Sequence, residues 1–262
     1  MPTLTSPPRL RAGDVALRRA ALPARHAEAR RSRRHPRTTQ FDYLHLRRLL
    51  DDLEDLLPTL APPGTDVLDV FCGTRPYDDL LAADVRCVGL DVTSDYGVAD
   101  VVSDEFLPFA DASFDAVMCL EALHFVPDPR RAVGELRRVV KPGGKVLITV
   151  PLVWEYHRRG LEHRWTGPDL LELFSGWDEL RVKEQGGRGV TWATLTGHLA
   201  FIAQERLDRR PGLAALAPAF AAGYFAVSAI GALVDRLDRR FPREDLTLPM
   251  NLLVAGCRPA DA

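Results

Sequence analysis

Hydrophobic residues recur at helical spacing early in the chain and gather into short apolar runs further along. Across residues 41–57, leucines recur every three or four positions and acidic residues fill the gaps. This pattern predicts an amphipathic helix that caps the domain and ends at Pro58. After the turn Pro62-Pro63-Gly64, buried strands are predicted over residues 67–71, 86–91, 98–102 and 114–120.

A further helix and three more strands follow. Asp128 and Pro129 are residue types that favour an N-cap and a first helical position, so a helix is predicted to begin at Pro129. The turn Lys141-Pro142-Gly143-Gly144 ends this helix and leads into a strand over residues 145–150. Strands that alternate with helices predict βαβ units, and therefore a doubly wound α/β fold with a parallel sheet.

Two carboxylates stand where such a sheet binds ligands. Asp69 lies in a strand that runs directly into the turn Phe71-Cys72-Gly73, and Asp91 closes the next strand. A nucleotide site needs a loop whose backbone can approach the ligand, and a carboxylate about twenty residues later that accepts ribose hydroxyls. The spacing therefore indicates a nucleotide site at the carboxyl edge of the sheet.

Over residues 64–151 the sequence resembles the class I S-adenosylmethionine-dependent methyltransferases, in their small-molecule, type-11 branch. The motifs that carry the resemblance are Val67-Leu68-Asp69-Val70-Phe71-Cys72-Gly73-Thr74, Asp91, Asp100-Val101-Val102-Ser103-Asp104, Leu107-Pro108-Phe109, Ser113-Phe114-Asp115 and Val139-Val140-Lys141-Pro142-Gly143-Gly144. The resemblance implies a mostly parallel seven-stranded sheet with an antiparallel last strand. Residues 178–183 and 251–257 would then be the antiparallel pair, within a methyltransferase domain over residues 41–262.

The resemblance also implies S-adenosyl-L-methionine as the cofactor, with site residues carried over one by one. The amino-acid part of the cofactor would lie over Asp69, Phe71, Cys72 and Gly73, and its ribose would lie beside Asp91 and Val92. The adenine edge would lie beside Asp104 and Glu105, and the sulfonium would lie beside Leu120 and Glu121. Phe71 and Arg75 depart from the family pattern, because many relatives have glycine at both positions.

Methyl transfer to oxygen or nitrogen also calls for a general base with a pKa near the working pH. The segments 151–157 and 162–166 follow the fifth strand and are rich in aromatic and ionisable side chains. His157 and His163 are the first candidate bases, and His124 is the third. A lone histidine is more often a structural or surface residue than a base.

The expected reaction is therefore methyl transfer to O, N or C of a small-molecule acceptor that the motifs do not identify. The alternative is a non-catalytic interaction protein that keeps the methyltransferase fold. A dehydrogenase is disfavoured, because Gly73-Thr74-Arg75-Pro76 lacks the later glycines of the dinucleotide motif.

Residues 1–40 hold ten arginines against Asp14 and Glu28, lack hydrophobic periodicity and are broken by prolines. A disordered arm without a nucleic-acid partner is predicted for them. No apolar signal-peptide core follows the early basic residues. The four cysteines form no C-x-x-C pair, so reduced thiols, no metal site and a cytoplasmic location are expected.

Residues 213–234 carry no charge over a length that could cross a membrane. A single crossing there would separate the two strands predicted to pair on either side of it. A helical hairpin inserted over residues 191–240, with helices over 191–210 and 219–240, is predicted instead. Packing of its apolar surface on the core or in a homodimer is the favoured interpretation. Membrane-surface association is the less favoured one, and the arginines at the helix ends would support it.

Overall fold

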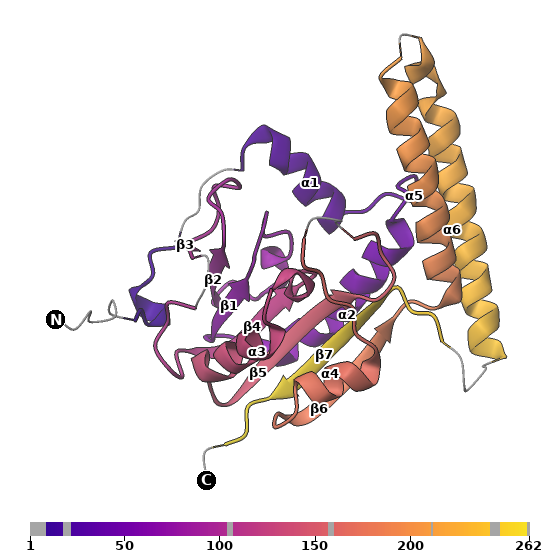
Figure 1. Cartoon of the computed structure of the whole chain (residues 1–262). Helices are drawn as coiled ribbons and strands as arrows, with labels where there is room; N and C mark the ends of the chain where they lie inside the picture. Colours follow the sequence, from indigo (N-terminus) through magenta and orange to yellow (C-terminus); the bar gives the residue numbers. More distant parts are fainter. Residues whose placement is uncertain are drawn as a thin grey trace.

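The structure, a computed structural model, describes residues 9–17, 22–103, 107–156, 160–210, 212–241 and 247–260 of the 262-residue chain. A seven-stranded sheet forms its centre, and a two-helix hairpin projects from one end (Figure 1). The strands are β1 (Asp66–Val70), β2 (Arg86–Asp91), β3 (Val101–Val102), β4 (Phe114–Leu120), β5 (Val140–Pro151), β6 (Asp178–Gln185) and β7 (Asn251–Cys257). The α-helices are α1 (Ala24–Arg34), α2 (Tyr43–Leu60), α3 (Pro129–Val139), α4 (Gly167–Leu173), α5 (Arg188–Asp208) and α6 (Ala217–Arg240), and the short 3₁₀ helices are η1 (Ala12–Asp14), η2 (Asp78–Leu80), η3 (Leu123–Phe125) and η4 (Leu213–Leu216).

The strand order is β3-β2-β1-β4-β5-β7-β6. Strands β3, β2, β1, β4 and β5 pair in parallel, whereas β7 is antiparallel to both β5 and β6. The predicted doubly wound, mostly parallel sheet with an antiparallel last strand is confirmed. Because the strand order reverses between β1 and β4, their carboxyl ends border the crevice where ligands bind in such sheets.

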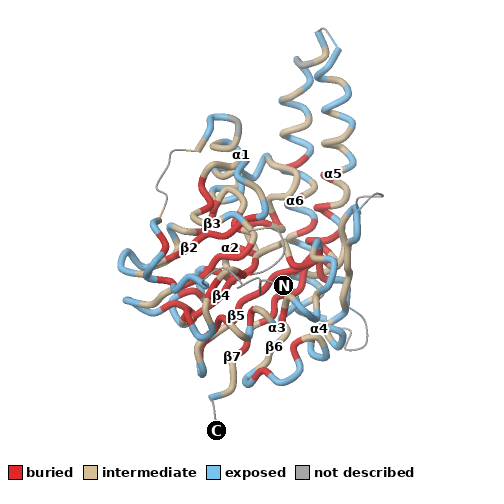
Figure 2. The backbone as a smooth tube through the Cα atoms, turned by 60° about the vertical axis from the view of Figure 1, so that its left-hand side comes forward, coloured by how far each residue is buried: buried red, intermediate tan, exposed pale blue. Residues whose placement is uncertain are grey.

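Helices cover the two faces of the sheet, and the central strands β1, β4 and β5 are largely buried, whereas β6 at the edge is mostly exposed (Figure 2). Val133 and Leu136 of α3 join Leu170 of α4 in the core on one face. Leucines of α2 fill the other face, where Leu49 and Leu53 are fully buried. Helix α3 begins at Pro129 as predicted, and the Asp128 carboxylate caps it by accepting a hydrogen bond from the backbone N–H of Arg131 at 3.0 Å.

The predicted alternation of strands and helices is incomplete. Between β1 and β2 the described chain forms only η2, so that crossover supplies no helix to cover the sheet. Helix α2, from before β1, covers this area instead. It also continues past Pro58, where its end was predicted, because Leu57 and Leu60 in its last turn are buried.

The described part of the basic arm packs against the domain, which differs from the predicted disorder. The backbone of Leu10 forms a parallel bridge with Phe109, and Ala12 and Val15 belong to the core. The Arg86 guanidinium donates to the carbonyl oxygens of Ala12 and Val15. The few apolar residues among the arginines are enough to attach the arm to the domain, since the sheet supplies most of their contacts.

The predicted hairpin is present as α5 and α6, joined through η4, and its base contacts α2. Its far end stands clear of the sheet (Figure 1). On α6, Phe225 is 54% exposed and Leu233 is 53% exposed. The core of this chain is therefore not the partner of that face, contrary to one of the two favoured expectations.

Shortening a core residue of the arm tests its part in folding. Val15→Ala is expected to lower the free energy of unfolding by about 1–2 kcal/mol, because it leaves a void beside the sheet. Arg9→Ala is the control, since its ion pair with Asp111 is largely exposed and contributes little. Urea denaturation measures both variants. Equal stability of Val15→Ala and Arg9→Ala would show that the arm does not contribute to the core.

Candidate cofactor pocket

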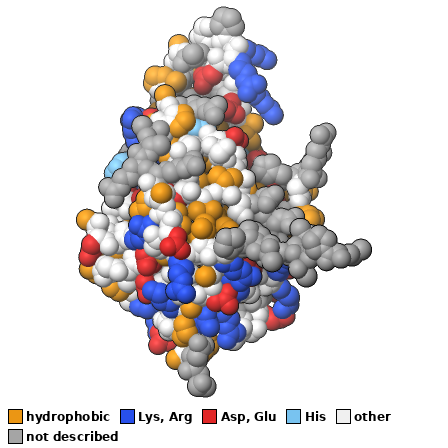
Figure 3. Space-filling view, turned by 90° about the vertical axis from the view of Figure 1, so that its left-hand side faces the viewer, with side chains coloured by type: hydrophobic (Ala, Val, Ile, Leu, Met, Phe, Trp, Pro, Cys, Tyr) orange, Lys and Arg blue, Asp and Glu red, His pale blue; other side chains and the backbone are white. Residues whose placement is uncertain are grey.

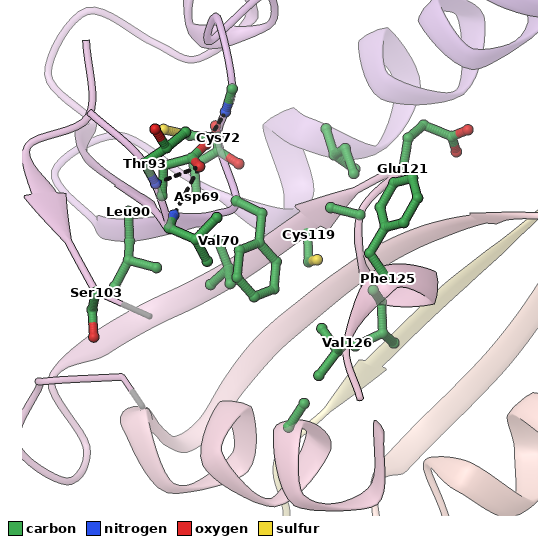
Figure 4. Close-up of a pocket in the computed structure, with 18 of the residues that line it drawn as sticks. Asp69, Val70, Cys72, Leu90, Thr93, Ser103, Cys119, Glu121, Phe125 and Val126 are labelled. Carbon is green, nitrogen blue, oxygen red and sulfur yellow. Dashed lines mark hydrogen bonds between the residues drawn. The ribbon is translucent and has the colours of Figure 1, made fainter. Parts of the chain in front are cut away.

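A cavity of about 840 Å³ lies at the carboxyl ends of β1, β2 and β4, with α1 contributing to its wall. Figure 4 shows Leu90 and Ser103 at one end and Glu121, Phe125 and Val126 at the other. The cavity brings together all the predicted cofactor residues that the structure describes, namely Asp69, Phe71, Cys72, Gly73, Asp91, Val92, Leu120 and Glu121. Asp104 and Glu105 lie outside the described residues.

Asp91 links the two loops that border this cavity. One carboxylate oxygen accepts the backbone N–H of Gly73 at 2.7 Å, and the other accepts those of Val92 and Thr93 at 2.8 and 3.3 Å. These bonds fix the loop after β1 to the end of β2. The buried carboxylate is therefore held in one orientation at the cavity wall.

The loop after β1 keeps a glycine-like backbone without the glycines. Gly73 has a φ of +52°, and Phe71 and Arg75 have φ values of +59° and +52°. A side chain in this left-handed region costs about 1–2 kcal/mol per residue. The two departures noted in the sequence thus fall where the backbone favours glycine, and other contacts must offset the strain.

For Arg75 those contacts are polar and buried. Its guanidinium lies 2.6 Å from a carboxylate oxygen of Asp78 and 2.6 Å from one of Asp100, and it donates to the carbonyl of Cys87 at 2.9 Å. Asp100 is fully buried and also accepts the N–H of Gly89 at 2.8 Å. Arg75 therefore joins the loop after β1 to β2 and to the segment before β3.

Burial controls the charge state of the groups on the cavity floor. It raises the pKa of Asp69 well above its usual range; Asp78 and Asp91 add to the rise, and Arg75 opposes it. Burial also raises the pKa values of the Cys72 and Cys119 thiols. Both cysteines stay protonated at neutral pH, so neither is prepared to act as a nucleophile.

Glu121 forms the end of the cavity beyond β4. Its side chain accepts a hydrogen bond from the Asn251 amide at 2.6 Å, and its backbone N–H donates to the carbonyl and hydroxyl oxygens of Thr149 at 3.0 and 2.9 Å. Its φ is +58°, so the backbone is strained at this position. Strain of this kind is concentrated at functional sites.

The histidines proposed as bases do not gather in the cavity. His124 is buried, and its backbone carbonyl accepts the N–H of His163 at 2.9 Å, but neither residue lines the cavity. The ring of His124 instead packs against that of Phe125, which does line the cavity, at 3.9 Å between centroids. The role of either histidine as a base stays a prediction. His157 lies outside the described residues. The part of the chain that the structure describes holds no cluster of side chains that could bind a metal ion.

Sequence reasoning missed the wall formed by α1. His26, Ala29 and Arg33 of this helix line the cavity, as does the buried Tyr77. The ring of His26 meets that of Tyr96 edge-on at 5.0 Å between centroids, joining α1 to the loop after β2. Helix α1 has no apolar stripe, so its sequence carried no periodic signal that could have revealed it.

Comparison with known proteins identifies the family. A family model described as a methyltransferase domain matches residues 68–148. A demethylmenaquinone methyltransferase from Corynebacterium urealyticum is 31% identical over 167 residues, which cover 52% of this chain and 73% of that protein. The chain belongs to the methyltransferase family. The class I, S-adenosylmethionine-dependent membership predicted from the motifs is confirmed.

Other similarities in the family are partial. A 2-methyl-6-phytyl-1,4-hydroquinone methyltransferase from Synechocystis sp. is 32% identical over 157 residues, covering 53% of this chain and 46% of that protein. The chain spans less than half the length of the first curated relatives it matches. Among solved structures, the [4+2]-cyclase SpnF shares the fold, with a TM-score of 0.51 and 20% identity over 80% of this chain and 81% of that one.

Replacing Arg75 tests the buried ion pair against the backbone strain. Arg75→Ala is expected to lower the free energy of unfolding by about 3–5 kcal/mol, because Asp100 keeps a buried charge without its guanidinium. Arg75→Gly should recover about 1 kcal/mol of this loss, since glycine suits a φ of +52°. Urea denaturation compares the two, and a glycine variant no more stable than the alanine variant would contradict the strain.

Asp69→Asn tests the raised pKa of Asp69. An acid whose pKa is raised by folding stabilises the protein at low pH, and this contribution is lost as the pH rises through the folded-state pKa. The asparagine variant should therefore be more stable than the parent at pH 7, and the difference should shrink as the pH falls towards 4. Denaturation across this range measures the effect, and a difference that does not change with pH would refute it.

Proposed function

We propose that this protein transfers a methyl group from S-adenosyl-L-methionine to an O, N or C atom of a small, lipophilic acceptor. The observation that carries the proposal is the cavity that joins Asp69, the Phe71–Gly73 turn, Asp91 and Glu121 along one edge of the sheet. Family membership agrees with this use of the cavity.

The residues present fit this cofactor. The cavity volume is in the range of cofactor sites, about 300–1,000 Å³. Gly73 has open space where a Cβ would stand, so the backbone there can approach a ligand closely. Both Asp69 and Asp91 are buried carboxylates at the cavity wall, which suits a ligand with an ammonium group and a ribose diol.

Each part of the wall then has a separate role. The Asp91 carboxylate, already oriented by three backbone N–H groups, has an acceptor position left on the oxygen that contacts Gly73, which would accept a ribose hydroxyl. Asp69 would hold the amino-acid part of the cofactor, and Leu120 and Glu121 would border its sulfur. When bound, the cofactor would supply a methyl group on a positively charged sulfur, with a neutral thioether as the leaving group.

The acceptor would enter beside Glu121, where the chain's own residues hold and orient it. Phe125, Val126 and Pro76 give this part of the cavity apolar walls, and Arg33 and Tyr77 add polar groups. Both relatives described above are named for quinone-type acceptors, a phytyl-hydroquinone and a demethylmenaquinone. These names and the apolar walls together support a lipophilic acceptor. Holding it in line with the methyl group would supply much of the rate acceleration.

Calorimetric titration with S-adenosyl-L-methionine tests the proposal. The parent protein should bind it with a micromolar dissociation constant, roughly −8 kcal/mol. Asp91→Ala should weaken binding by about 10- to 150-fold, because the ribose hydroxyls lose a charged acceptor. Asp95→Ala, in the same loop but exposed, should bind like the parent.

Failure of the parent protein to bind the cofactor would favour the alternative, a non-catalytic interaction protein that keeps this fold. Parent-like affinity of Asp91→Ala would instead remove Asp91 from the site and leave the reaction class standing.

A further inference from the structure

The outer face of α6 is apolar where a helix in water is normally polar. The exposed residues between positions 215 and 233, at the end of η4 and along α6, include no charged side chain. The large ones are Leu216, Phe225, Ile230 and Leu233, each between 43% and 54% exposed. Only 17% of the most apolar window of this helix is buried, although its length and composition would suit a membrane span. The outer face therefore has the composition of a surface in contact with hydrocarbon.

Two sets of polar contacts lie on the inner side of the hairpin, between α5 and α6. The Tyr224 hydroxyl donates to the Gln204 side chain at 2.7 Å. The buried Asp235 carboxylate accepts the backbone N–H groups of Gly189 and Val190 at 2.8 and 3.2 Å. The apolar residues Val227 and Ala232 also pack on the inner side, so α6 has apolar side chains on its outer face in addition to those that it buries.

Exposed arginines stand at both ends of the apolar face. At the tip of the hairpin, Arg206, Arg209 and Arg210 outnumber the acidic Glu205 and Asp208. Arginine side chains gather on one side of this tip at the top of Figure 3. At the base, the exposed arginines are Arg236, Arg239 and Arg240, whereas the nearby Asp238 is paired with Arg188 at 3.1 Å.

This charge distribution distinguishes a second copy of the chain from a lipid surface. A two-fold dimer through α6 would bring positive ends together, whether the two helices ran parallel or antiparallel. An anionic lipid surface complements both ends at once, and each arginine near it contributes about fivefold in affinity. The charges therefore favour lipid as the occupant.

The same charges determine the orientation of the hairpin. If its tip crossed the bilayer, Glu205 and Asp208 in the last turn of α5 would enter hydrocarbon, where a charged side chain is strongly disfavoured. If α6 lies flat, its apolar face meets the acyl chains and the arginines at either end reach the headgroups. Figure 1 shows α6 at the outer edge of the molecule, with α5 and the sheet on its other side.

We propose that the outer face of α6 binds the surface of an anionic phospholipid bilayer, with the helix lying in the membrane plane. Phe225, Ile230 and Leu233 insert among the acyl chains, and the arginines at the two ends contact lipid phosphates. The catalytic domain would then be held at the membrane surface. This inference does not depend on the methyl-transfer reaction, because it concerns a surface outside the cofactor cavity.

Vesicle flotation of the full chain tests the proposal. The parent protein should float with vesicles of phosphatidylglycerol and phosphatidylcholine, and much less with vesicles of phosphatidylcholine alone. Phe225→Glu should weaken binding by about tenfold or more, because it replaces an inserted aromatic ring with a charge. Replacing Arg236, Arg239 and Arg240 with glutamine should weaken it by about fivefold per residue and reduce its sensitivity to salt.

Ala203→Glu is the matched control, since it adds the same charge at an exposed position of α5, off the outer face of α6. It should bind vesicles like the parent. Circular dichroism and cofactor titration of each variant verify that the fold is intact. We expect Phe225→Glu to fold normally, because the side chain of Phe225 is exposed.

Two results would overturn the proposal. One is a failure of the parent protein to float with anionic vesicles, or a Phe225→Glu variant that floats with them as well as the parent does. The other is a dimer seen by analytical ultracentrifugation without lipid that Phe225→Glu dissociates, because a second copy would then be the partner of this face.

Discussion

The buried guanidinium of Arg75 is the interaction on which the ligand edge of this sheet depends. It holds Asp78, Asp100 and the carbonyl of Cys87 together where only the 3₁₀ helix η2, and no α-helix, connects β1 to β2. Without a helix to cover it, the loop after β1 depends on these buried contacts for its shape. Arg75 has a strained, left-handed backbone conformation. The strain is tolerated because, without the arginine side chain, buried carboxylates would be unpaired.

The loop that Arg75 holds in turn positions the residues of the cavity. Asp91 joins the same loop through the N–H of Gly73, so the floor and the rim of the cavity form one hydrogen-bonded unit. The missing crossover helix leaves the sheet to be covered by elements from the N-terminal part of the chain. Helix α2 covers one face, and α1 closes the cavity with His26 and Arg33, so the basic segment is part of the site.

The hairpin follows a different physical rule from the rest of the molecule. In the domain, large apolar side chains face inward and bury the sheet, whereas α6 leaves Phe225, Ile230 and Leu233 exposed on its outer face. The hairpin base packs against α2 and against residues such as Trp154 and Met250, whereas its far end stands clear of the sheet. Its outer face is therefore open to a partner that the domain itself does not provide.

The sequence by itself determined the sheet, the family and most of the cofactor residues, because these depend on local signals. Apolar runs predicted the strands. The residue types of Asp128 and Pro129 predicted the start of α3, and the spacing of Asp69 and Asp91 predicted the edge of the sheet where a ligand binds. Tertiary structure alone decided the role of the basic arm, the absence of an α-helix between β1 and β2, and the hydrogen bond between the backbones of His124 and His163. These features depend on contacts between residues far apart in the chain. Ala12 and Val15 are too few to produce a periodic pattern, yet the core formed by other segments buries them. Whether residues 213–234 would face core or solvent was likewise open, since a run of apolar residues specifies a helix that avoids water but not the surface that covers it.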